Sequence, residues 1–537
     1  MPTVPYPSFV GPAYRLASVN AAGDRCVNLY PQTIQSGTGK GKNSLETTPG
    51  LQLFATLTKS PCRGLWAGDN RLFGVGDDTL YEVSSAGAIT SIGAMNSAST
   101  PATIIPNGVG TQLLICSGSQ IWVSNGAAPS RPSYGTLTGL VNTTGTSVTW
   151  GGGDKFTSTM VGTSITINAV AYTVATFIND ESITLTASAG VQILSVYSWT
   201  DYVNGVAAAY LGGYFCVLSP NSNTINVSNL NDGLTWDALD YQQRISRPDR
   251  LQMIYTIGQQ LWLLGQSTSE AWVLTDADFP LTAVEGSLVD YGIWAAFSVA
   301  GVGDNSFMFV SGSNERGFGS VKLVNGYKFS TVSTYAVEYA IRSYSTSTDA
   351  VAYSYTSMGH TFYVLNFPTA SKTWAYDVGE NAWHERAYST SLTGQLQRFA
   401  CAVFKENMVG SGTTGKIYQM RHDVYTDDTV TIRRVRQSPH LSEEQLWNFY
   451  SYFQLDADVG DVPSTAPDIT LEISNDGGKT FGTPITIAMG AISEYTKRVK
   501  WNRLGRSRDR VFKVTCDAAV FQSWCNAYLK VEPGSGT

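Results

Sequence analysis

The sequence predicts an all-β protein, and its composition and local patterning indicate this. Its 537 residues include 52 Gly and are 12% aromatic but only 14% charged. Thr, Ser, Tyr, Val and Gly recur in short runs, which is typical of strands joined by tight turns. Stretches with apolar residues at helical spacing are scarce. A chain of this length should divide into two to four domains.

Repetition along the chain narrows the predicted fold. Seven segments share one pattern: an apolar strand, a polar Gly/Asn turn, then a second strand that carries an aromatic residue. They begin near positions 72, 113, 214, 261, 307, 361 and 407, and all spacings but one lie between 41 and 54 residues. A period of about 40–50 residues with several short strands is the signature of propeller blades. We therefore expect a six- or seven-bladed β-propeller-like body, with residues 61–136 as its first part and 200–428 as its second.

The sixth repeat ends in a segment that resembles the hairpin of a kelch blade, Tyr376-Asp377-Val378-Gly379-Glu380-Asn381-Ala382-Trp383. The one irregular spacing, 101 residues, falls to 38 when the 63 residues 137–199 are set aside. This segment holds 13 Thr and only four charged residues, and its parts 164–168 and 182–186 alternate apolar and polar side chains. We interpret it as an inserted small β domain that projects from the propeller. A docking role and a spacer role both remain open for it.

The two ends of the chain lack the repeat. Residues 429–537 contain a Pro/Gly-bearing loop at 460–467 and strand-like runs, which predicts a separate C-terminal β-sandwich. Residues 1–60 are Pro/Tyr-rich with a Gly/Lys loop at 36–42, and we expect an N-terminal arm that packs on other parts. The first residues lack the basic and apolar regions of a targeting segment, and the apolar stretch near Ile293–Val302 is too short to span a bilayer.

Few residues suggest chemistry. The seven Cys are odd in number and form no C-x-x-C pair, so we expect free, buried thiols in a reducing cytoplasm. The four His lack metal-ligand spacing, and we expect satisfied surface or core side chains at His360, His384, His422 and His440. No phosphate-binding loop, nucleophile elbow or zinc-protease motif occurs. We therefore predict no catalytic residue, metal or cofactor.

One motif is enzyme-like. Ser474–Phe481 fits the Asp-box of sialidases, and Asp232–Trp236 is a degenerate version of it. In that motif the Asp accepts hydrogen bonds from nearby backbone amides, Gly supplies positive φ, and the aromatic residue packs below the turn. In sialidases the box lies away from the catalytic centre, and their Arg-bearing N-terminal motif is missing here. We interpret the segment as a structural turn.

The densest charge lies at Lys497–Lys513, a segment defined here as the basic run. It holds eight Lys/Arg and one Asp, a local charge of +7, whereas the whole chain carries −7, so the remainder carries −14. We expect a basic hairpin in which a strand ends at Asn502 and a partner strand returns through Phe512. The candidate interface or DNA-facing residues are Lys497, Arg498, Lys500, Arg503, Arg506, Arg508 and Arg510.

Three roles are open for the basic run: a contact with another protein subunit, a DNA-facing role in a channel, or a solvated edge strand guarded by charge. Ordinary DNA-binding proteins gain affinity by neutralising phosphates, and a sequence pI near 5.3 disfavours that. An acidic body with one basic strip is instead compatible with a conduit through which a duplex slides.

Ordered motifs of the C-terminal region resemble a known family. Residues 438–444, 453–456, 474–481 and 497–506 occur in the order found in the packaged-DNA stabilization protein, or tail hub (nozzle), of short-tailed lambdoid bacteriophages. Residues 26–31, 48–51 and 340–344 add to the resemblance. It covers the chain from end to end except 137–199, which departs from that family's pattern and resembles small β modules inserted in phage tail proteins.

The resemblance implies a non-enzymatic virion component. Such hubs form a hexameric ring on the head-to-tail adaptor below the portal, and they carry the tail needle or fibre and tailspikes. Double-stranded DNA would pass through the lumen without sequence specificity. The protein would be made in the host bacterial cytoplasm, become part of the virion tail, and need no membrane span. Two alternatives are a host-receptor-binding adhesin and a propeller glycosidase or depolymerase, which needs paired carboxylates in a central cleft.

Overall fold

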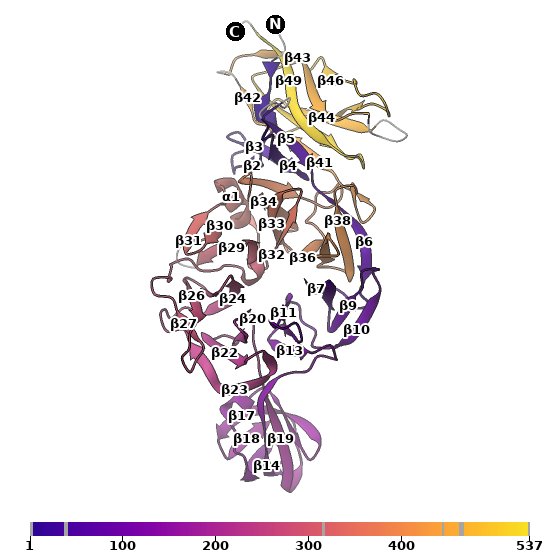
Figure 1. Cartoon of the computed structure of the whole chain (residues 1–537). Coiled ribbons are helices and arrows are strands. Elements are labelled where there is room, and N and C mark those ends of the chain that lie inside the picture. The colour runs from indigo at the N-terminus through magenta and orange to yellow at the C-terminus, as the bar shows by residue number, and fades with distance from the viewer. Residues whose placement is uncertain (1–3, 37–40, 314–316, 443–444, 461–466, 535–537) are drawn as a thin grey trace. The chain divides into compact units, whose positions relative to one another are not determined.

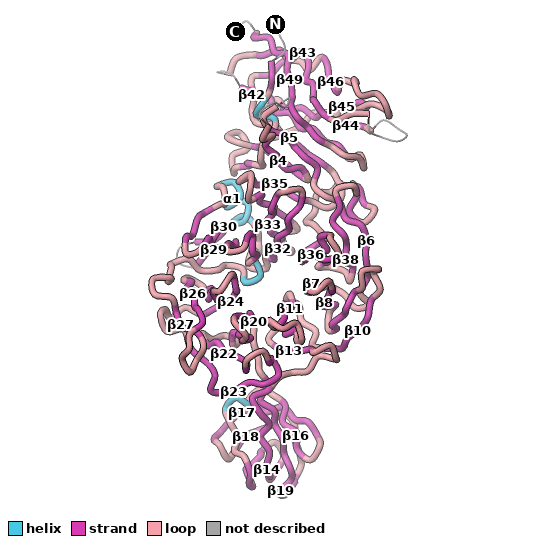
Figure 2. Tube along the Cα trace, viewed as in Figure 1, coloured by secondary structure: helices cyan, strands magenta, loops and turns pink. Residues whose placement is uncertain are grey.

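The computed structural model describes residues 4–36, 41–313, 317–442, 445–460 and 467–534 in two compact units. The larger unit comprises Met1–Ile92, Arg247–Val273 and Ala283–Thr537, and the smaller one Gly93–Ser246 and Leu274–Thr282. Strands dominate both (Figure 2). Among the described residues, the helical segments are α1 (Tyr335–Ser343) and the 3-10 turns η1 (Pro7–Phe9), η2 (Ser158–Met160) and η3 (Ala296–Ser298). The all-β prediction is confirmed.

Five antiparallel blade sheets belong wholly or mostly to the larger unit (Figure 1). The first is β7 (Cys62–Gly68), β8 (Arg71–Gly76), β9 (Thr79–Val83) and β10 (Ile89–Ala94). The next are β24 (Leu251–Ile257), β25 (Gln260–Gly265), β26 (Ser269–Leu274) and β27 (Leu281–Ala283), then β28 (Ala300–Gly303), β29 (Ser306–Ser313), β30 (Gly317–Asn325) and β31 (Lys328–Thr331). The last two are β32 (Val351–Ser357), β33 (His360–Phe367), β34 (Lys372–Asp377) and β35 (Ala382–Arg386), and β36 (Gln397–Val403), β37 (Glu406–Ser411), β38 (Lys416–Arg421) and β6 (Gly50–Thr56).

The smaller unit contains two more sheets of blade type. One is β11 (Ala102–Pro106), β12 (Leu113–Ser117) and β13 (Gln120–Ser124); the other is β20 (Ala207–Leu211), β21 (Tyr214–Leu218), β22 (Thr224–Asn229) and β23 (Asp232–Gln243). Within the described residues the two units thus hold seven such sheets. Each predicted repeat is the second and third strand of one of them, as the pairings β8–β9, β12–β13, β21–β22, β25–β26, β29–β30, β33–β34 and β37–β38 confirm. The kelch-like hairpin is also present, with Tyr376 opposite Trp383.

Apolar side chains at alternating strand positions hold neighbouring blades of the larger unit together. Leu72 and Tyr81 of the first blade pack with Met408 and Ile417 of the blade closed by β6. That blade packs in turn against the β32–β35 sheet through a second cluster, which includes Val409, Tyr418, Phe362 and Val364. Because β6 comes from the N-terminal region and pairs with β38, the last blade is completed by residues more than 350 positions away.

The C-terminal residues form a two-sheet sandwich with strands from the N-terminal segment. One sheet contains β1 (Val4–Pro5), β4 (Leu29–Thr33), β5 (Asn43–Thr47), β43 (Asn448–Ala457), β46 (Val499–Asn502), β47 (Arg506–Ser507) and β49 (Ser523–Pro533). The other contains β2 (Tyr14–Arg15), β3 (Gly23–Val27), β41 (Arg434–Gln437), β42 (Leu441–Ser442), β44 (Asp468–Ser474), β45 (Ile485–Ala488) and β48 (Asp509–Cys516). A parallel pair, Val27 with Glu385, joins this second sheet to β35 of the propeller.

Two short pieces, β39 (Thr426–Asp427) and β40 (Val430–Thr431), connect the last blade to the sandwich. Positions 37–40 of the expected Gly/Lys loop and 461–466 of the expected Pro/Gly-bearing loop lie outside the described residues.

Residues 137–199 form most of a small closed barrel in the smaller unit (Figure 1). Its strands are β14 (Ser133–Thr144), β15 (Ser147–Gly153), β16 (Ser164–Ile167), β17 (Val170–Asn179), β18 (Ser182–Leu185) and β19 (Val191–Tyr202). They pair in the cyclic order β14-β15-β18-β17-β16-β19, and β19 returns to β14. The barrel has its own core of aliphatic and aromatic side chains, including Val148, Ile165 and Trp199. The two strands that period-two alternation predicted here are β16 and β18.

Candidate interface surfaces

The basic run crosses between the two sheets of the sandwich, so the predicted hairpin is wrong. β46 pairs with β43, with Trp501 opposite Phe453, and β47 pairs with the start of the same strand. β48 pairs instead with β41, β42 and β44 in the other sheet. The cause is packing of the core: the rings of Trp501 and Phe512 both lie against Phe453, at centroid distances of 5.8 and 4.9 Å. Strands in opposite sheets can face one another across such a core.

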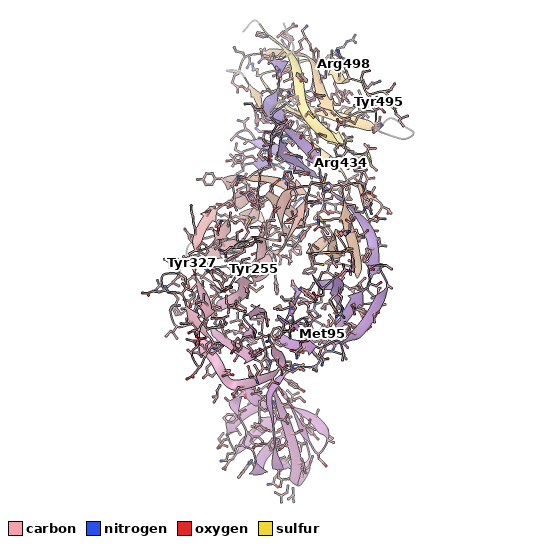
Figure 3. All side chains as sticks on the ribbon, viewed as in Figure 1. Met95, Tyr255, Tyr327, Arg434, Tyr495 and Arg498 are labelled. Atoms are coloured by element: carbon pink, nitrogen blue, oxygen red, sulfur yellow. The ribbon has the colours of Figure 1, made fainter. Side chains whose placement is uncertain are left out.

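Five members of the predicted set are exposed at the surface of the sandwich: Lys497, Arg498, Arg503, Arg506 and Arg508. Figure 3 labels Arg498 and the neighbouring Tyr495 there. None of the five forms an ion pair with a carboxylate of the described residues. These charges are therefore available to a partner.

Aromatic side chains of one strand region support the basic residues. The guanidinium carbons of Arg506 and Arg508 lie 4.6 and 4.9 Å from the ring centre of Trp447, a trio defined here as the Trp447 patch. The ammonium of Lys500 lies 3.6 Å from the ring centre of Tyr452. Each such contact contributes about 0.5–1 kcal/mol at an exposed site, so the rings hold the cations in place without neutralising them.

Arg510 does not belong to the exposed set, which corrects the prediction for this residue. Its side chain is fully buried, its guanidinium carbon lies 4.3 Å from the ring centre of Tyr450, and Nη1 donates to the Leu504 carbonyl at 2.7 Å. Burial lowers the pKa of Arg510 to about 10. Period-two alternation could not reveal this because Arg510, Val511 and Phe512 are all buried where β48 enters the core.

A histidine holds Asp509, which lies between Arg508 and Arg510 at the start of β48. His440 Nδ1 lies 2.9 Å from Asp509 Oδ1, and its Nε2 lies 2.8 Å from the carbonyl oxygen of Val19. Burial alone would lower the pKa of His440, but these two hydrogen bonds together with the negative charges of Asp509 and Asp24 raise it. The protonated ring can donate to both acceptors, so the position of Asp509, and with it the start of β48, is coupled to the charge of His440.

The Asp-box is a structural turn, as its motif predicts. Asp476 accepts hydrogen bonds from the amides of Lys479 and Thr480, at 3.0 and 2.9 Å. Hydrogen bonds from Ser474 and Thr480 are the main reason that the pKa of Asp476 is lowered. Gly477 and Gly478, with φ of +70° and +80°, supply the left-handed conformation that the turn needs.

Sequence reasoning missed Trp447 and Tyr452. Both lie in the aromatic-rich segment 447–453, and this density of aromatic residues was a usable signal. Their basic partners could not be identified from the sequence, because only the fold brings β46 and β47 beside β43. His384 departs from the expectation of a satisfied side chain, because it is buried and its two ring nitrogens have no hydrogen-bond partner among the described residues. Burial lowers the pKa of His384 to about 3, so its ring is neutral.

The inserted barrel presents an uncharged apolar surface on β19. Val191, Ile193 and Val196 are 76%, 78% and 64% exposed, and no charged residue occurs from 182 to 200. Pairing with β14 shifts register between Val141 and Thr143, which places a β-bulge at Ile193 and Leu194. Leu194 has φ +49°, a left-handed conformation that is costly for a leucine and that is concentrated at functional positions.

The described residues also include free thiols and a groove with acidic side chains. No group of three or more His, Cys, Asp or Glu is placed to hold a metal ion there. All seven cysteines are free, with Cys401 and Cys525 half-buried and the others buried. A groove of about 460 Å³ in the smaller unit is lined by Asp240, Asp276 and Asp278, but the last two are exposed to water. No helix of the described part is long and apolar enough to cross a membrane.

Comparison with solved structures finds matches of low similarity. The N-terminal domain of Nup159 shares 7% identity over 73% of this chain and 97% of its own, with a TM-score of 0.34. The Neurospora crassa Pan2 WD40 domain shares 8% over 76% and 93% (TM-score 0.28), and Kluyveromyces lactis Hsv2 shares 8% over 60% and 97% (TM-score 0.26). Scores this low carry no functional argument. A search of curated proteins gives no significant match.

Sequence profiles of two phage domains account for most of the chain. The profile of the bacteriophage P22 Gp10 β-propeller matches residues 23–425, and that of the Gp10 β-sandwich matches residues 433–532. The first match contains the blade sheets and the inserted barrel, and the second contains the basic run and the Trp447 patch. The chain therefore belongs to the bacteriophage P22 Gp10 family of phage-stabilising tail hub proteins, structural components of the phage tail.

Proposed function

We propose that this protein is the ring-forming hub of the tail, seated below the portal and adaptor, which surrounds the DNA exit channel and retains packaged DNA. The family assignment supports the hub role. The structural observation that supports ring formation is the pair of exposed arginines in the Trp447 patch, which form no ion pair within the described residues. This role requires that the chain form a hexamer. It also requires a tail needle or fibre and tailspikes as partners. Synthesis in the host cytoplasm and incorporation into the virion tail complete the proposal.

The Trp447 patch fits an acidic protein surface better than DNA. The basic run carries +7 while the remainder of the chain carries −14, so a neighbouring copy offers an excess of carboxylates. A heterologous contact between unlike surfaces, repeated by rotation, closes a ring. Opposite charge at such a contact speeds encounter and fixes register. In the ring, DNA would meet the remaining cations as a repeated, low-affinity lining.

The test is charge reversal at the two exposed arginines. Arg506→Glu with Arg508→Glu should leave the fold intact, because both side chains are exposed, and should abolish rings in negative-stain images with and without adaptor. Lys479→Glu, an exposed lysine of the same sandwich outside the basic run, is the matched control and should still form rings. Six-fold rings from the double variant would refute the assignment of the patch to assembly. Loss of packaged DNA from particles whose rings are intact would favour the DNA-facing role.

A second measurement addresses the DNA conduit. Filter binding of free duplex to the wild-type chain should be weak and should disappear at moderate salt, because few phosphates are neutralised at once. Tight binding that resists salt would contradict a conduit through which the duplex slides.

The exposed apolar side chains of β19 and the left-handed conformation of Leu194 support a docking role of the inserted barrel for tailspikes or the host surface. Leu137 pairs with Trp199, and the preceding pair is Thr136 with Thr200, so residues 137–199 can be replaced by a two-residue Asn-Gly turn. Rings that form without spike or host attachment would support docking. Failure to form rings would make the barrel structural, and release of products from capsular glycans by the intact chain would favour the depolymerase alternative.

A further inference from the structure

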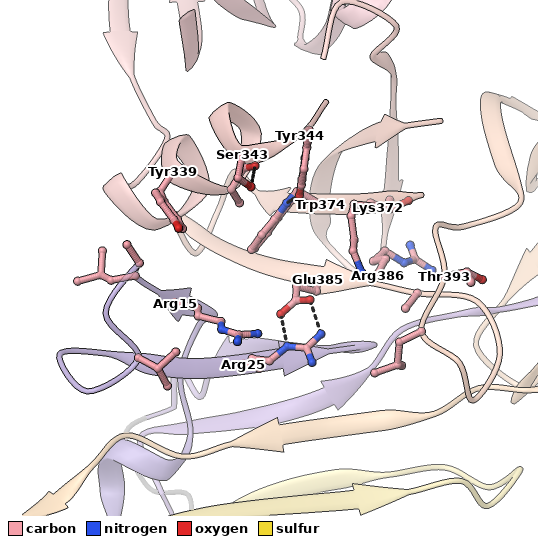
Figure 4. A pocket seen from close by; sticks show the side chains of 17 residues that line it. Arg15, Arg25, Tyr339, Ser343, Tyr344, Lys372, Trp374, Glu385, Arg386 and Thr393 are labelled. Carbon is pink, nitrogen blue, oxygen red and sulfur yellow. Dashed lines mark hydrogen bonds and ion pairs between the residues drawn. The ribbon is translucent and has the colours of Figure 1, made fainter. Parts of the chain in front are cut away.

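A cavity of about 340 Å³ lies in the larger unit where the β32–β35 sheet continues into the sandwich (Figure 4). Its lining comes from segments far apart in sequence: β2 and β3, the C-terminal half of α1, and the β34–β35 hairpin with the loop after it. The volume is at the lower end for ligand sites, which matches one side chain or a peptide end rather than a folded domain.

The cavity carries excess positive charge. Three basic side chains and one carboxylate line it: Arg15, Arg25, Lys372 and Glu385. Arg386 also borders the cavity, but its buried guanidinium donates to the Tyr355 hydroxyl and the Pro49 carbonyl instead. Arg25 holds both oxygens of Glu385 in a two-pronged ion pair, with Nε–Oε1 at 2.8 Å and Nη2–Oε2 at 2.6 Å. Arg15 and Lys372 are exposed, and neither forms an ion pair within the described residues. Figure 4 shows both extending toward the Arg25–Glu385 pair.

Hydrogen-bond donors in the cavity outnumber free acceptors. Glu385 is occupied by Arg25, the Ser343 hydroxyl donates to the Ala340 carbonyl at 2.7 Å, and Trp374 Nε1 donates to the Tyr344 hydroxyl at 3.0 Å. Burial raises the pKa of Tyr344 to about 12, so its hydroxyl keeps its proton. The Tyr344 hydroxyl, the Arg15 guanidinium and the Lys372 ammonium are all donors, and an acceptor-rich anion satisfies all three.

The wall of the cavity is aromatic and continues along α1. Trp374 is buried, Tyr339 is 49% exposed, and Tyr335, one helical turn earlier on the same face, is 79% exposed. Exposed tyrosines beside arginine are typical of protein-recognition surfaces, where the rings bury the apolar stem of a partner residue. A free inorganic anion would make no use of this wall.

We infer that this cavity binds a carboxylate side chain, glutamate or aspartate, of an acidic segment of a partner polypeptide. Arg15 and Lys372 pair with the carboxylate, Tyr344 donates a hydrogen bond to it, and Trp374 and Tyr339 cover the side-chain stem. Because the cavity lies at the junction of propeller and sandwich, the bound segment contacts both parts.

The inference can be tested with the full chain labelled with 5-fluorotryptophan, in which Trp374→Phe identifies the Trp374 fluorine resonance. Acetyl-Leu-Glu-Leu-amide should shift that resonance with saturable, millimolar affinity. The glutamine counterpart of the peptide should bind at least tenfold more weakly, and inorganic phosphate should bind no more tightly than the glutamate peptide. Equal binding of the glutamine peptide, tighter binding of phosphate, or no binding at the solubility limit would each overturn the inference.

Variants of the two unpaired cations separate binding from folding. Arg15→Gln and Lys372→Gln should each weaken the glutamate peptide about tenfold or more, and the other tryptophan resonances should keep their positions. Lys328→Gln, an exposed lysine of β31, is the matched control and should bind as the wild type does. Unchanged affinity in both cavity variants would sink the proposal.

Discussion

Replacing Asn28 tests how the propeller and the sandwich are joined. This residue follows β3, is completely buried, and adopts φ +55°. Its side-chain amide donates to the carbonyls of Ala387 and Arg433 at 2.9 and 2.8 Å, and its Oδ1 accepts from the Ala387 amide at 2.9 Å. One side chain thus ties the end of β35 to the start of the sandwich strand β41.

The cost of Asn28→Ala follows from these contacts. The Ala387 amide loses its acceptor, and the Arg433 carbonyl loses a donor, whereas the Ala387 carbonyl keeps a bond from Gln395. Each buried backbone group left without a partner costs about 1–3 kcal/mol. Alanine in the left-handed conformation adds about 1 kcal/mol. We expect a local destabilisation of about 3–7 kcal/mol in Asn28→Ala, and about 1 kcal/mol less in Asn28→Gly, which tolerates this φ.

Hydrogen exchange at the Ala387 amide measures this local destabilisation directly. Its amide should exchange at least a hundredfold faster in Asn28→Ala, since about 2.7 kcal/mol of local opening free energy corresponds to that factor. Amides of β8 and β9, in a blade without contact to Asn28, provide the internal control. Protection of Ala387 that stays within threefold of the wild type, in a variant that remains folded, would refute the reasoning.

Three further substitutions test other sites. The pKa of His440 is raised in the fold, so its contribution is full at acidic pH and is lost as pH rises through that pKa; the melting difference between wild type and His440→Ala should shrink from pH 5 to pH 9. Burial raises the pKa of Asp427 to about 7, so wild-type stability should fall between pH 5 and 8, and calorimetry of Asp427→Asn should show a flatter profile. Leu194→Gly should stabilise the barrel by up to about 1 kcal/mol in thermal unfolding; a loss of more than 1 kcal/mol would show that the bulge serves folding rather than docking.

The blade pattern could be predicted from the sequence because its determinants are local. Each repeat holds two strands and one turn within about 20 residues, as in Leu113–Cys116 with Ile121–Trp122, so periodicity alone locates the hairpin. The Asp-box could be predicted for the same reason: all its hydrogen bonds join residues 474–480.

The path of the basic run depends on contacts that are not local. β46 and β48 are separated by only six residues, and a hairpin is the common outcome for strands so close. Packing on the ring of Phe453 instead places β46 and β48 in different sheets, because Trp501 and Phe512 contact this ring from opposite sheets. The same packing buries Arg510, a residue that sequence patterning grouped with its exposed neighbours.

Both candidate binding surfaces combine segments that are far apart in the sequence. For this reason the distribution of charge along the sequence did not identify all of their residues. The basic run was conspicuous because its cations are contiguous, yet Trp447, which positions two of them, lies about 60 residues earlier. In the cavity, Arg15 and Lys372 are single cations separated by more than 350 residues, and neither stands out in the sequence. A basic residue becomes a candidate binding site when the fold places an aromatic side chain beside it and leaves it without a carboxylate as ion-pair partner. By that criterion the cavity is as well equipped as the basic run, and an assembly variant confined to Arg506 and Arg508 should leave carboxylate binding at Lys372 intact.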